Sequence, residues 1–227
     1  EEDGCSVSPE HKTCTCGEEE VNFTAHEADG WAFDHWDPAQ TVVCPEDGGT
    51  KQVTAVFSPV LAVSGSGEDS ICPPAGAVKE QKVLSFSLCA SKADSWKVSA
   101  ITVDASGSGD EAADTDMVIL TGAGGEEYRG SYTTDNGSVT FEFPVPYVIE
   151  PEECKTFELT YRFNAAPECS RQTRDYRAVV SAANVVAAPQ HFDPGHTSGR
   201  AEGKIVTGCV WNVDTGLRYD SIQAAVN

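Results

Sequence analysis

Apolar and polar residues alternate along much of the chain, which is the pattern of strands that bury one face. The alternation is clearest at residues 82–90 (KVLSFSLCA), where Leu84, Phe86 and Leu88 share one side, and it recurs between residues 99 and 163. Runs rich in Gly, Asp, Asn and Pro separate these segments, as expected for turns. The pattern predicts an all-β chain without a long helix.

Helix and strand compete in one segment, residues 176–188 (YRAVVSAANVVAA). Its alanines favour a helix, whereas its four valines and the neighbouring strands favour a strand, which we predict. With this segment, about eight or nine strands follow one another at regular spacing between residues 61 and 213. Such spacing is typical of an antiparallel β-sandwich.

Residues 1–59 are expected to form a small separate unit. The phrases ADGWAFDHWDP and KQVTAVFSP resemble the bacterial surface repeat "GY.F..W … V.A.F", a family that includes the internalin-type B repeats. The resemblance covers roughly residues 4 to 59 and implies a compact β-rich spacer or adhesive module without catalysis. The matching positions are Gly30, Trp31, Phe33, Trp36, Val53, Ala55 and Phe57.

Residues 60–207 are expected to form the second unit. The order VLSFSL, W.VSAITVDASGSGD, Y.GSYTTDNGSVTFEF and I.PEECKTFELTYRF resembles an immunoglobulin-like module of bacterial and archaeal surface proteins. The fold class implied is a small β-rich repeat module followed by an antiparallel immunoglobulin-like β-sandwich. Residues 208–227, with "V.N..TG..Y.SIQAA", resemble the opening of a right-handed parallel β-helix. We expect this tail to connect neighbouring subunits by packing or by strand addition.

Charge limits the classes of partner. The chain has 36 acidic and 15 basic residues, a formal net charge of −21, which disfavours nucleic acid and anionic membrane surfaces. No apolar run approaches the roughly 20 residues that span a bilayer, so we predict no direct membrane insertion. Cations are the natural partners, and carbohydrate stays open because tryptophans can stack on sugars. Trp31, Trp36 and Trp96 nevertheless stand where strand cores need them.

Nine cysteines without the paired spacing of a zinc site predict disulfides and a secreted, extracellular or cell-surface location. Two sequons, at Asn22 and Asn136, permit glycosylation there. The disulfide candidates are Cys5, Cys14, Cys16, Cys44, Cys72, Cys89, Cys154 and Cys169.

Spacing narrows the pairing of these cysteines. Cys14 and Cys16 are too close to bond each other, so we expect them to bond Cys5 and Cys44, in either order. The most local choice in the second unit is Cys72 with Cys89 and Cys154 with Cys169. Cys209 is then the odd cysteine, either a buried thiol or a bond to another chain.

A turn-rich acidic segment is the main candidate for a metal site. Calcium binds six to eight oxygens, and carboxylates are concentrated here without the spacing of an EF-hand. The alternative is a solvated acidic loop. The residues are Asp104, Asp110, Glu111, Asp114 and Asp116.

Two histidine-containing segments carry weaker candidates. His191, Asp193 and His196 could chelate zinc or copper, although an exposed connection is the simpler interpretation. Asp34 and His35 suggest acid–base chemistry, but the sequence indicates neither a nucleophile nor a cleft beside them.

The sequence as a whole predicts a non-enzymatic extracellular structural or adhesive protein. We expect a self-assembling subunit of a cell-surface filament, sheath or layer that forms a homo-oligomer or polymer through residues 208–227. The alternative is a set of accessory modules of a longer secreted β-helix protein that binds or degrades polysaccharide.

Overall fold

A computed structural model describes residues 5–8, 20–37, 41–43, 52–67, 70–71, 80–164, 174–207, 210–211 and 218–219. This part of the chain is nearly all β, which confirms the all-β prediction. Its helices are α1 (Glu111–Asp114) and the single 3-10 turn η1 (Ala182–Asn184). Within the described residues, no helix has the length and apolar character needed to cross a membrane.

The strands follow in chain order. They are β1 (Ser6–Ser8), β2 (Glu20–Asn22), β3 (Thr24–His26), β4 (Trp31–Asp37), β5 (Thr41–Val43), β6 (Thr54–Ser66), β7 (Ser70–Ile71), β8 (Glu80–Ala90), β9 (Trp96–Gly107), β10 (Thr115–Thr121), β11 (Glu127–Gly130), β12 (Ser138–Ile149), β13 (Cys154–Phe163), β14 (Arg174–Ser181), β15 (Val185–Pro189), β16 (His196–Thr207), β17 (Val210–Trp211) and β18 (Arg218–Tyr219).

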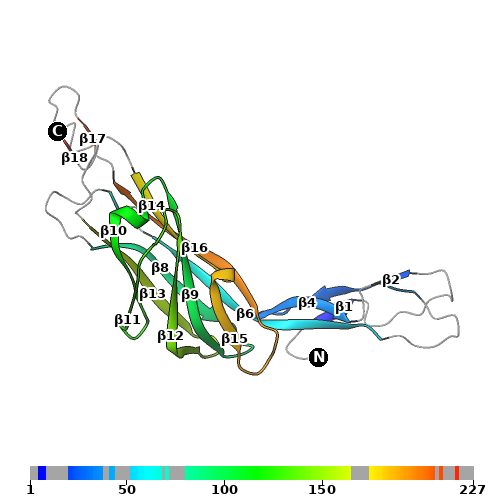
Figure 1. The fold of residues 1–227 in the computed structure, drawn as a ribbon. Coiled ribbons are helices and arrows are strands. Elements are labelled where there is room, and N and C mark those ends of the chain that lie inside the picture. The colour runs from blue at the N-terminus through cyan, green and yellow to red at the C-terminus, as the bar shows by residue number, and fades with distance from the viewer. Residues whose placement is uncertain are drawn as a thin grey trace.

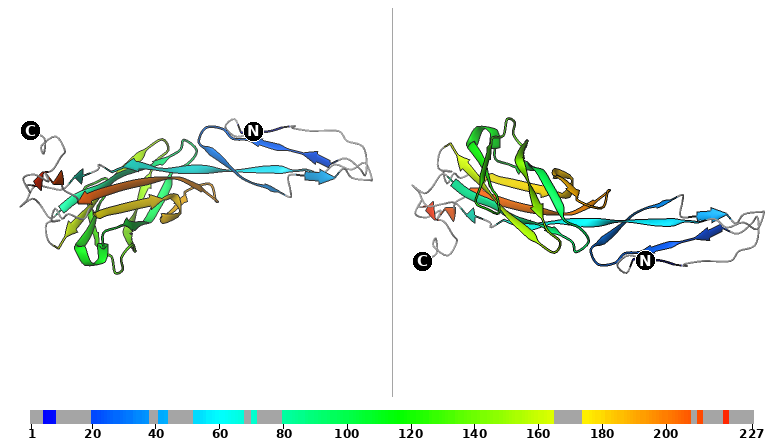
Figure 2. Two further views of the ribbon diagram at one scale, coloured as in Figure 1. Left: turned by 90° about the horizontal axis from the view of Figure 1, so that it is seen from above. Right: turned by 90° about the horizontal axis from the view of Figure 1, so that it is seen from below.

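One large sheet curls into a nearly closed barrel (Figures 1 and 2). Its strands follow the order β11-β10-β13-β8-β6-β16-β14-β9-β12, and β15 pairs with β9 beside β14. The end strands β11 and β12 are not hydrogen-bonded neighbours, yet their side chains touch: the rings of Tyr128 and Phe143 are 4.8 Å apart. The barrel therefore closes through side chains along this seam.

The parallel pairing of β16 distinguishes the sheet from the purely antiparallel arrangement that we expected. His196 to Gly199 of β16 lie opposite Val60 to Val63 of β6, with both strands running in the same direction. The reason is the return of the chain through the connection after β15, which starts β16 at the same end of the barrel as β6.

The N-terminal unit is built on an extension of a barrel strand. β4 pairs antiparallel with the first half of β6, from Trp31 opposite Pro59 to Asp37 opposite Thr54. The second half of β6 is a strand of the barrel wall, where it pairs with β8 and β16. The expected boundary between residues 59 and 60 therefore lies within one continuous strand, which gives the molecule its elongated shape (Figure 2).

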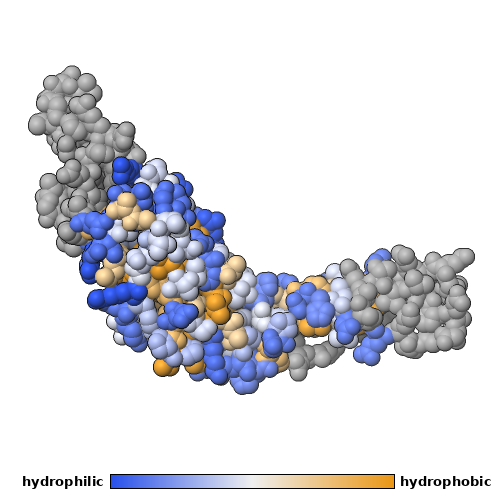
Figure 3. Space-filling model, in the orientation of Figure 1, coloured by the Kyte–Doolittle hydropathy of each residue, from blue (hydrophilic) through white to orange (hydrophobic). Residues whose placement is uncertain are grey.

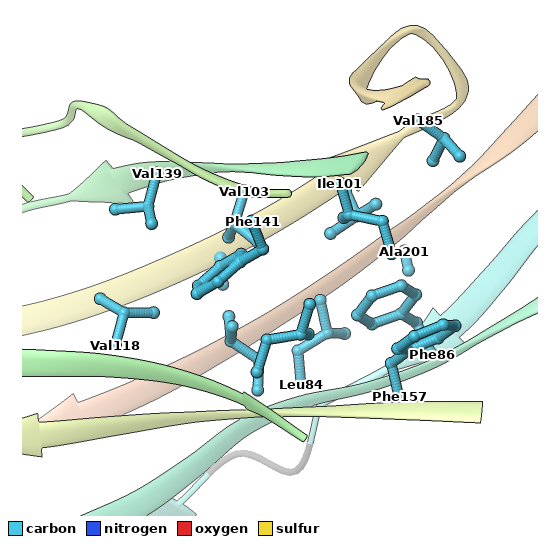
Figure 4. Close-up of a cluster of buried hydrophobic side chains, with 14 of the residues drawn as sticks. Leu84, Phe86, Ile101, Val103, Val118, Val139, Phe141, Phe157, Val185 and Ala201 are labelled. Carbon is cyan, nitrogen blue, oxygen red and sulfur yellow. The ribbon is translucent and has the colours of Figure 1, made fainter. Parts of the chain in front are cut away.

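Alternating apolar side chains fill the barrel (Figure 4). Leu84, Phe86 and Leu88 of β8 are all buried, and the ring of Phe86 stacks on that of Phe157 from β13 at 5.4 Å. Trp96 is 1% exposed and Trp31 is 7% exposed, so both occupy the core positions expected of them, whereas Trp36 is only partly buried.

The ambiguous segment at residues 176–188 is extended, as predicted, but it is interrupted. β14 and β15 occupy its two ends, and η1 separates them. This break allows β14 and β15 to pair in turn with different parts of β9. Of the expected tail, β17 and β18 are described and pair antiparallel.

Candidate functional site

The acidic segment proposed for calcium is distributed over three elements. Asp104 lies in β9, where its carboxylate accepts a hydrogen bond of 2.6 Å from the side-chain amide of Asn184. Asp110 caps α1, since its carboxylate accepts a hydrogen bond of 3.0 Å from the backbone N–H of Ala113. Both carboxylates therefore stabilise local structure.

Asp114 and Asp116 also have separate partners. Asp114 accepts hydrogen bonds from Tyr176 Oη at 2.7 Å and from Arg174 Nη1 at 3.1 Å. Asp116, on β10, lies 3.8 Å from Arg162 Nη1. No three Asp, Glu, His or Cys side chains come together as a metal site in the described part of the chain. Calcium binding by this segment stays a prediction.

Glu111 is the chemically unusual member of the segment, because its side chain is fully buried. Its Oε2 accepts a hydrogen bond of 3.3 Å from the backbone N–H of Asn136, whereas its Oε1 has no partner among the described residues. Burial raises the pKa of Glu111 to about 7, and the nearby Asp135 adds to the increase.

A buried aspartate that sequence reasoning missed, Asp94, anchors the loop around His191. Its side chain is 1% exposed, and it accepts hydrogen bonds of 2.7 Å from His191 Nδ1, 2.7 Å from His191 N and 3.0 Å from Phe192 N. Asp193 and His196 are exposed and are not gathered with His191 into a metal site in the part of the chain described. The loop is held by a carboxylate from outside the HFDPGH motif.

This loop also joins the two units. The ring of Phe192 packs edge-on against Trp31 at 5.2 Å. Outside this loop, the N–H of Val60 also links the two units by a hydrogen bond to the carbonyl oxygen of Gly30. Asp34 and His35 lie apart from it on the surface of β4, hydrogen-bonded to each other at 2.7 Å.

The described disulfide joins Cys89 to Cys154, which corrects the expected pairing of each with its nearest cysteine in sequence. The physical reason is register: the two residues lie opposite each other on the neighbouring strands β8 and β13, with Cα atoms 4.1 Å apart. Strand pairing here brings together residues 65 positions apart.

Cys5 is a free thiol in the structure, not the disulfide partner that we expected it to be. Its sulfur instead accepts a hydrogen bond of 3.4 Å from the backbone N–H of Ala28, because the pairing of β1 with β3 places it beside that turn. The remaining candidates lie outside the described residues: Cys14, Cys16, Cys44, Cys72, Cys169 and Cys209.

A shallow groove of about 650 Å³ follows the seam between β11 and β12, and we refer to it as the seam groove. Val145 is 79% exposed at its edge, and Tyr147 Oη donates a hydrogen bond of 2.9 Å to Glu126 Oε2 at its base. The hydroxyl of Tyr128 lies 3.3 Å from that of Tyr147. Its lining includes Glu126, Tyr128, Pro144, Val145, Tyr147, Val148 and Lys155.

The outward position of Val145 follows from the strand register. Glu142 lies opposite Ala100 on β9 and Tyr147 opposite Val98, so residues 143–146 bulge out of the ladder. Two prolines in this bulge, Pro144 and Pro146, have no N–H to donate. The sequence signal that could have identified this groove was the unusual FPVPY run inside an otherwise alternating strand.

Comparison with known proteins assigns the chain to no family. No protein-family model and no curated protein match it. Among solved structures, AvmM, which catalyses macrocyclisation in alchivemycin A biosynthesis, is 7% identical with a TM-score of 0.39 over 66% of this chain and 92% of its own.

Two further solved structures are longer chains, and the similarity covers about half of each. A DUF4466 family protein from Parabacteroides merdae is 18% identical with a TM-score of 0.29, over 60% of this chain and 44% of its own. CfaE, the adhesive subunit of CFA/I fimbria of enterotoxigenic Escherichia coli, is 10% identical with a TM-score of 0.29, over 68% of this chain and 51% of its own.

Proposed function

We propose that the protein is a non-enzymatic extracellular structural or adhesive subunit that transmits tension along its long axis within a filament, sheath or layer. The observation that carries the proposal is the parallel pairing of β6 and β16. β6 enters the barrel from the N-terminal unit, and β16 runs to the opposite end, beside β17 and β18 (Figure 1).

Tension between the two ends would load this pair in shear. It would pull β6 toward the N-terminal unit and β16 toward the opposite end, so that their shared hydrogen bonds resist together. β6 is also bonded to β8, and β16 to β14, so neither strand can be peeled away one bond at a time. This arrangement suits a load-bearing subunit.

The Cys89–Cys154 disulfide supports an oxidising location without identifying it. We include in the proposal the immunoglobulin-like character of residues 60–207, which rests on the succession of strands and their buried alternating faces. Connection of subunits through residues 208–227 also belongs to the proposal, and it rests on the apolar residues of that segment.

Stretching single molecules by their two ends tests load bearing. We expect the barrel to resist until one cooperative rupture, and a barrel that extends gradually at low force would refute the role.

Electron microscopy of the purified protein tests assembly, with removal of residues 217–227 and Cys209→Ser as variants. Removal of these residues should leave folded monomers, and C209S should weaken assembly under oxidising conditions if Cys209 bridges subunits. Polymers formed equally well by both variants would exclude the tail as connector.

A further inference from the structure

The seam groove presents apolar side chains to solvent at a place where strand pairing is blocked. Val145 and Val148 are 79% and 38% exposed, and apolar surface is visible over this side of the barrel (Figure 3). Exposed apolar residues beside an open sheet edge commonly attract another strand. Here Pro144 and Pro146 cannot donate ladder hydrogen bonds, which disfavours strand addition and favours a ligand that binds through side chains.

The polar groups of the groove form a chain of hydrogen bonds that ends on a carboxylate, which only accepts. The hydroxyl of Tyr147 donates its hydrogen bond to Glu126, so in the bond between the two tyrosines the hydroxyl of Tyr128 is the donor and that of Tyr147 the acceptor. The relay ends on the Glu126 carboxylate, which also accepts a hydrogen bond from the N–H of Gly124 at 3.1 Å. A hydrogen bond from its own N–H, followed by that from Tyr147, lowers the pKa of Glu126, so the carboxylate carries its charge at neutral pH.

Nearby cations are already paired. Lys155 forms an ion pair with Glu153, and Arg129 forms one with Glu127 at 2.9 Å. Among the described residues, the Glu126 carboxylate contacts only neutral donors. The groove therefore combines an apolar wall with the Glu126 carboxylate, which no cation of the described residues neutralises, because Lys155 in the lining is paired with Glu153.

We propose that the seam groove binds an extended peptide segment in which an arginine or lysine stands next to proline or other apolar residues. The apolar residues of the segment pack on Val145, Val148 and the ring of Tyr128, and its cation bonds to Glu126. A polyproline-type conformation suits this site, since its backbone stays hydrated and needs no ladder partner. Charge favours such a partner over a second copy of this chain, whose formal net charge is −21.

Matched labelled peptides test the site on the full chain. The probe is a fluorescein-labelled peptide of alternating proline and valine with an arginine at each end, and its control carries glutamine in place of both arginines. Fluorescence anisotropy should show saturable binding of the arginine peptide and at least about fivefold weaker binding of the control. Binding should weaken at high salt, because the charged contact is exposed to solvent.

Variants with matched controls locate the binding. Glu126→Gln and Val145→Ser should each weaken binding about threefold or more, whereas Glu142→Gln on β12 and Val186→Ser on β15 should not change it. These side chains are exposed, so circular dichroism should show all four variants folded. Equal binding of the two peptides, no binding of either, or equal effects of all four substitutions overturns the proposal. If V145S alone abolishes self-association of the protein, the proposal is overturned and the groove binds a second copy of this chain. If V145S alone abolishes glycan binding, the groove binds carbohydrate instead.

Discussion

The carboxylate of Asp94 holds the ring of His191, 97 residues further along the chain, through a hydrogen bond of 2.7 Å to Nδ1. The same carboxylate accepts the backbone N–H groups of His191 and Phe192, so it fixes the whole loop. Phe192 in turn packs on Trp31 of β4. One buried carboxylate therefore supports the contact between the barrel and the N-terminal unit.

Asp94→Asn should lower the free energy of unfolding by about 2 kcal/mol at neutral pH, because charge-assisted hydrogen bonds to a buried acceptor are lost. Urea denaturation followed by tryptophan fluorescence measures this change. The control is Asp193→Asn, which alters an exposed carboxylate on the same loop. Equal stabilities of D94N and D193N would remove Asp94 from its anchoring role.

Acid should weaken the same anchor. Burial of Asp94 acts to raise its pKa, but the hydrogen bonds from His191, Phe192 and Ser95 outweigh burial and lower the pKa below its ordinary value. A carboxyl whose folded-state pKa is depressed stabilises the fold above its unfolded-state pKa. That contribution is lost as pH falls through the lower folded-state value. The difference in stability between wild type and D94N should therefore shrink below about pH 4.

Glu111 should show the opposite dependence. Its folded-state pKa is raised to about 7, so ionisation of this buried group destabilises the fold. The stability of the wild type should fall as pH rises from the ordinary glutamate range to about 7, and stay reduced above it.

Glu111→Gln should remove this pH dependence and stabilise the chain by about 2 kcal/mol at pH 8, since a neutral amide replaces a buried charge. Thermal unfolding of both proteins between pH 4 and 8 measures the two effects. Glu127→Gln, which changes an exposed carboxylate on β11, is the control. A wild type whose stability is flat over this range would contradict the burial of an ionisable Glu111.

Local patterns predicted strands well, because the alternation at β8 and β13 is set by neighbouring residues that must face one core. They failed where long-range register decides. Cys89 bonds Cys154 because β8 and β13 are paired, and the spacing of cysteines alone favoured nearer partners. The FPVPY run marks an irregular strand, but the seam groove also depends on strands β11 and β12 meeting across the barrel, which that run alone does not encode.

The acidic segment shows that side chains close in sequence can acquire separate partners in the fold. Its carboxylates are close in sequence, yet strand and helix geometry directs Asp104 to Asn184 and Asp114 to Tyr176. Asp94 had no signal in its own neighbourhood, because its partners come from the loop around His191. Contacts between residues so far apart in sequence are set by the fold, and a short sequence motif does not predict them.

Reduction of the disulfide should lengthen the stretched molecule. Cys89 and Cys154 are 65 positions apart, and the disulfide prevents the chain between them from extending under force. Breaking it should add about 230 Å, at roughly 3.6 Å per residue, to the contour length gained when the barrel ruptures. Single-molecule stretching with and without reductant measures this difference, and an unchanged length would contradict the pairing.

The parallel pairing of β6 and β16 leads to a prediction that separates mechanical from thermodynamic stability. Thr197 of β16 lies opposite Leu61 of β6, whereas Ala188 of β15 pairs only with β9 in the described sheet. Thr197→Pro should lower the force at which the barrel ruptures, because proline weakens the ladder that is loaded in shear.

Ala188→Pro should leave that force unchanged, since β15 lies outside the path from β6 to β16. Circular dichroism and urea denaturation check that both variants are folded and allow their losses of stability to be compared. If A188P lowers the rupture force as much as T197P at similar stability, resistance to tension arises from the barrel as a whole. If only T197P does so, the force is carried by the β6–β16 pair, as a subunit under axial tension requires.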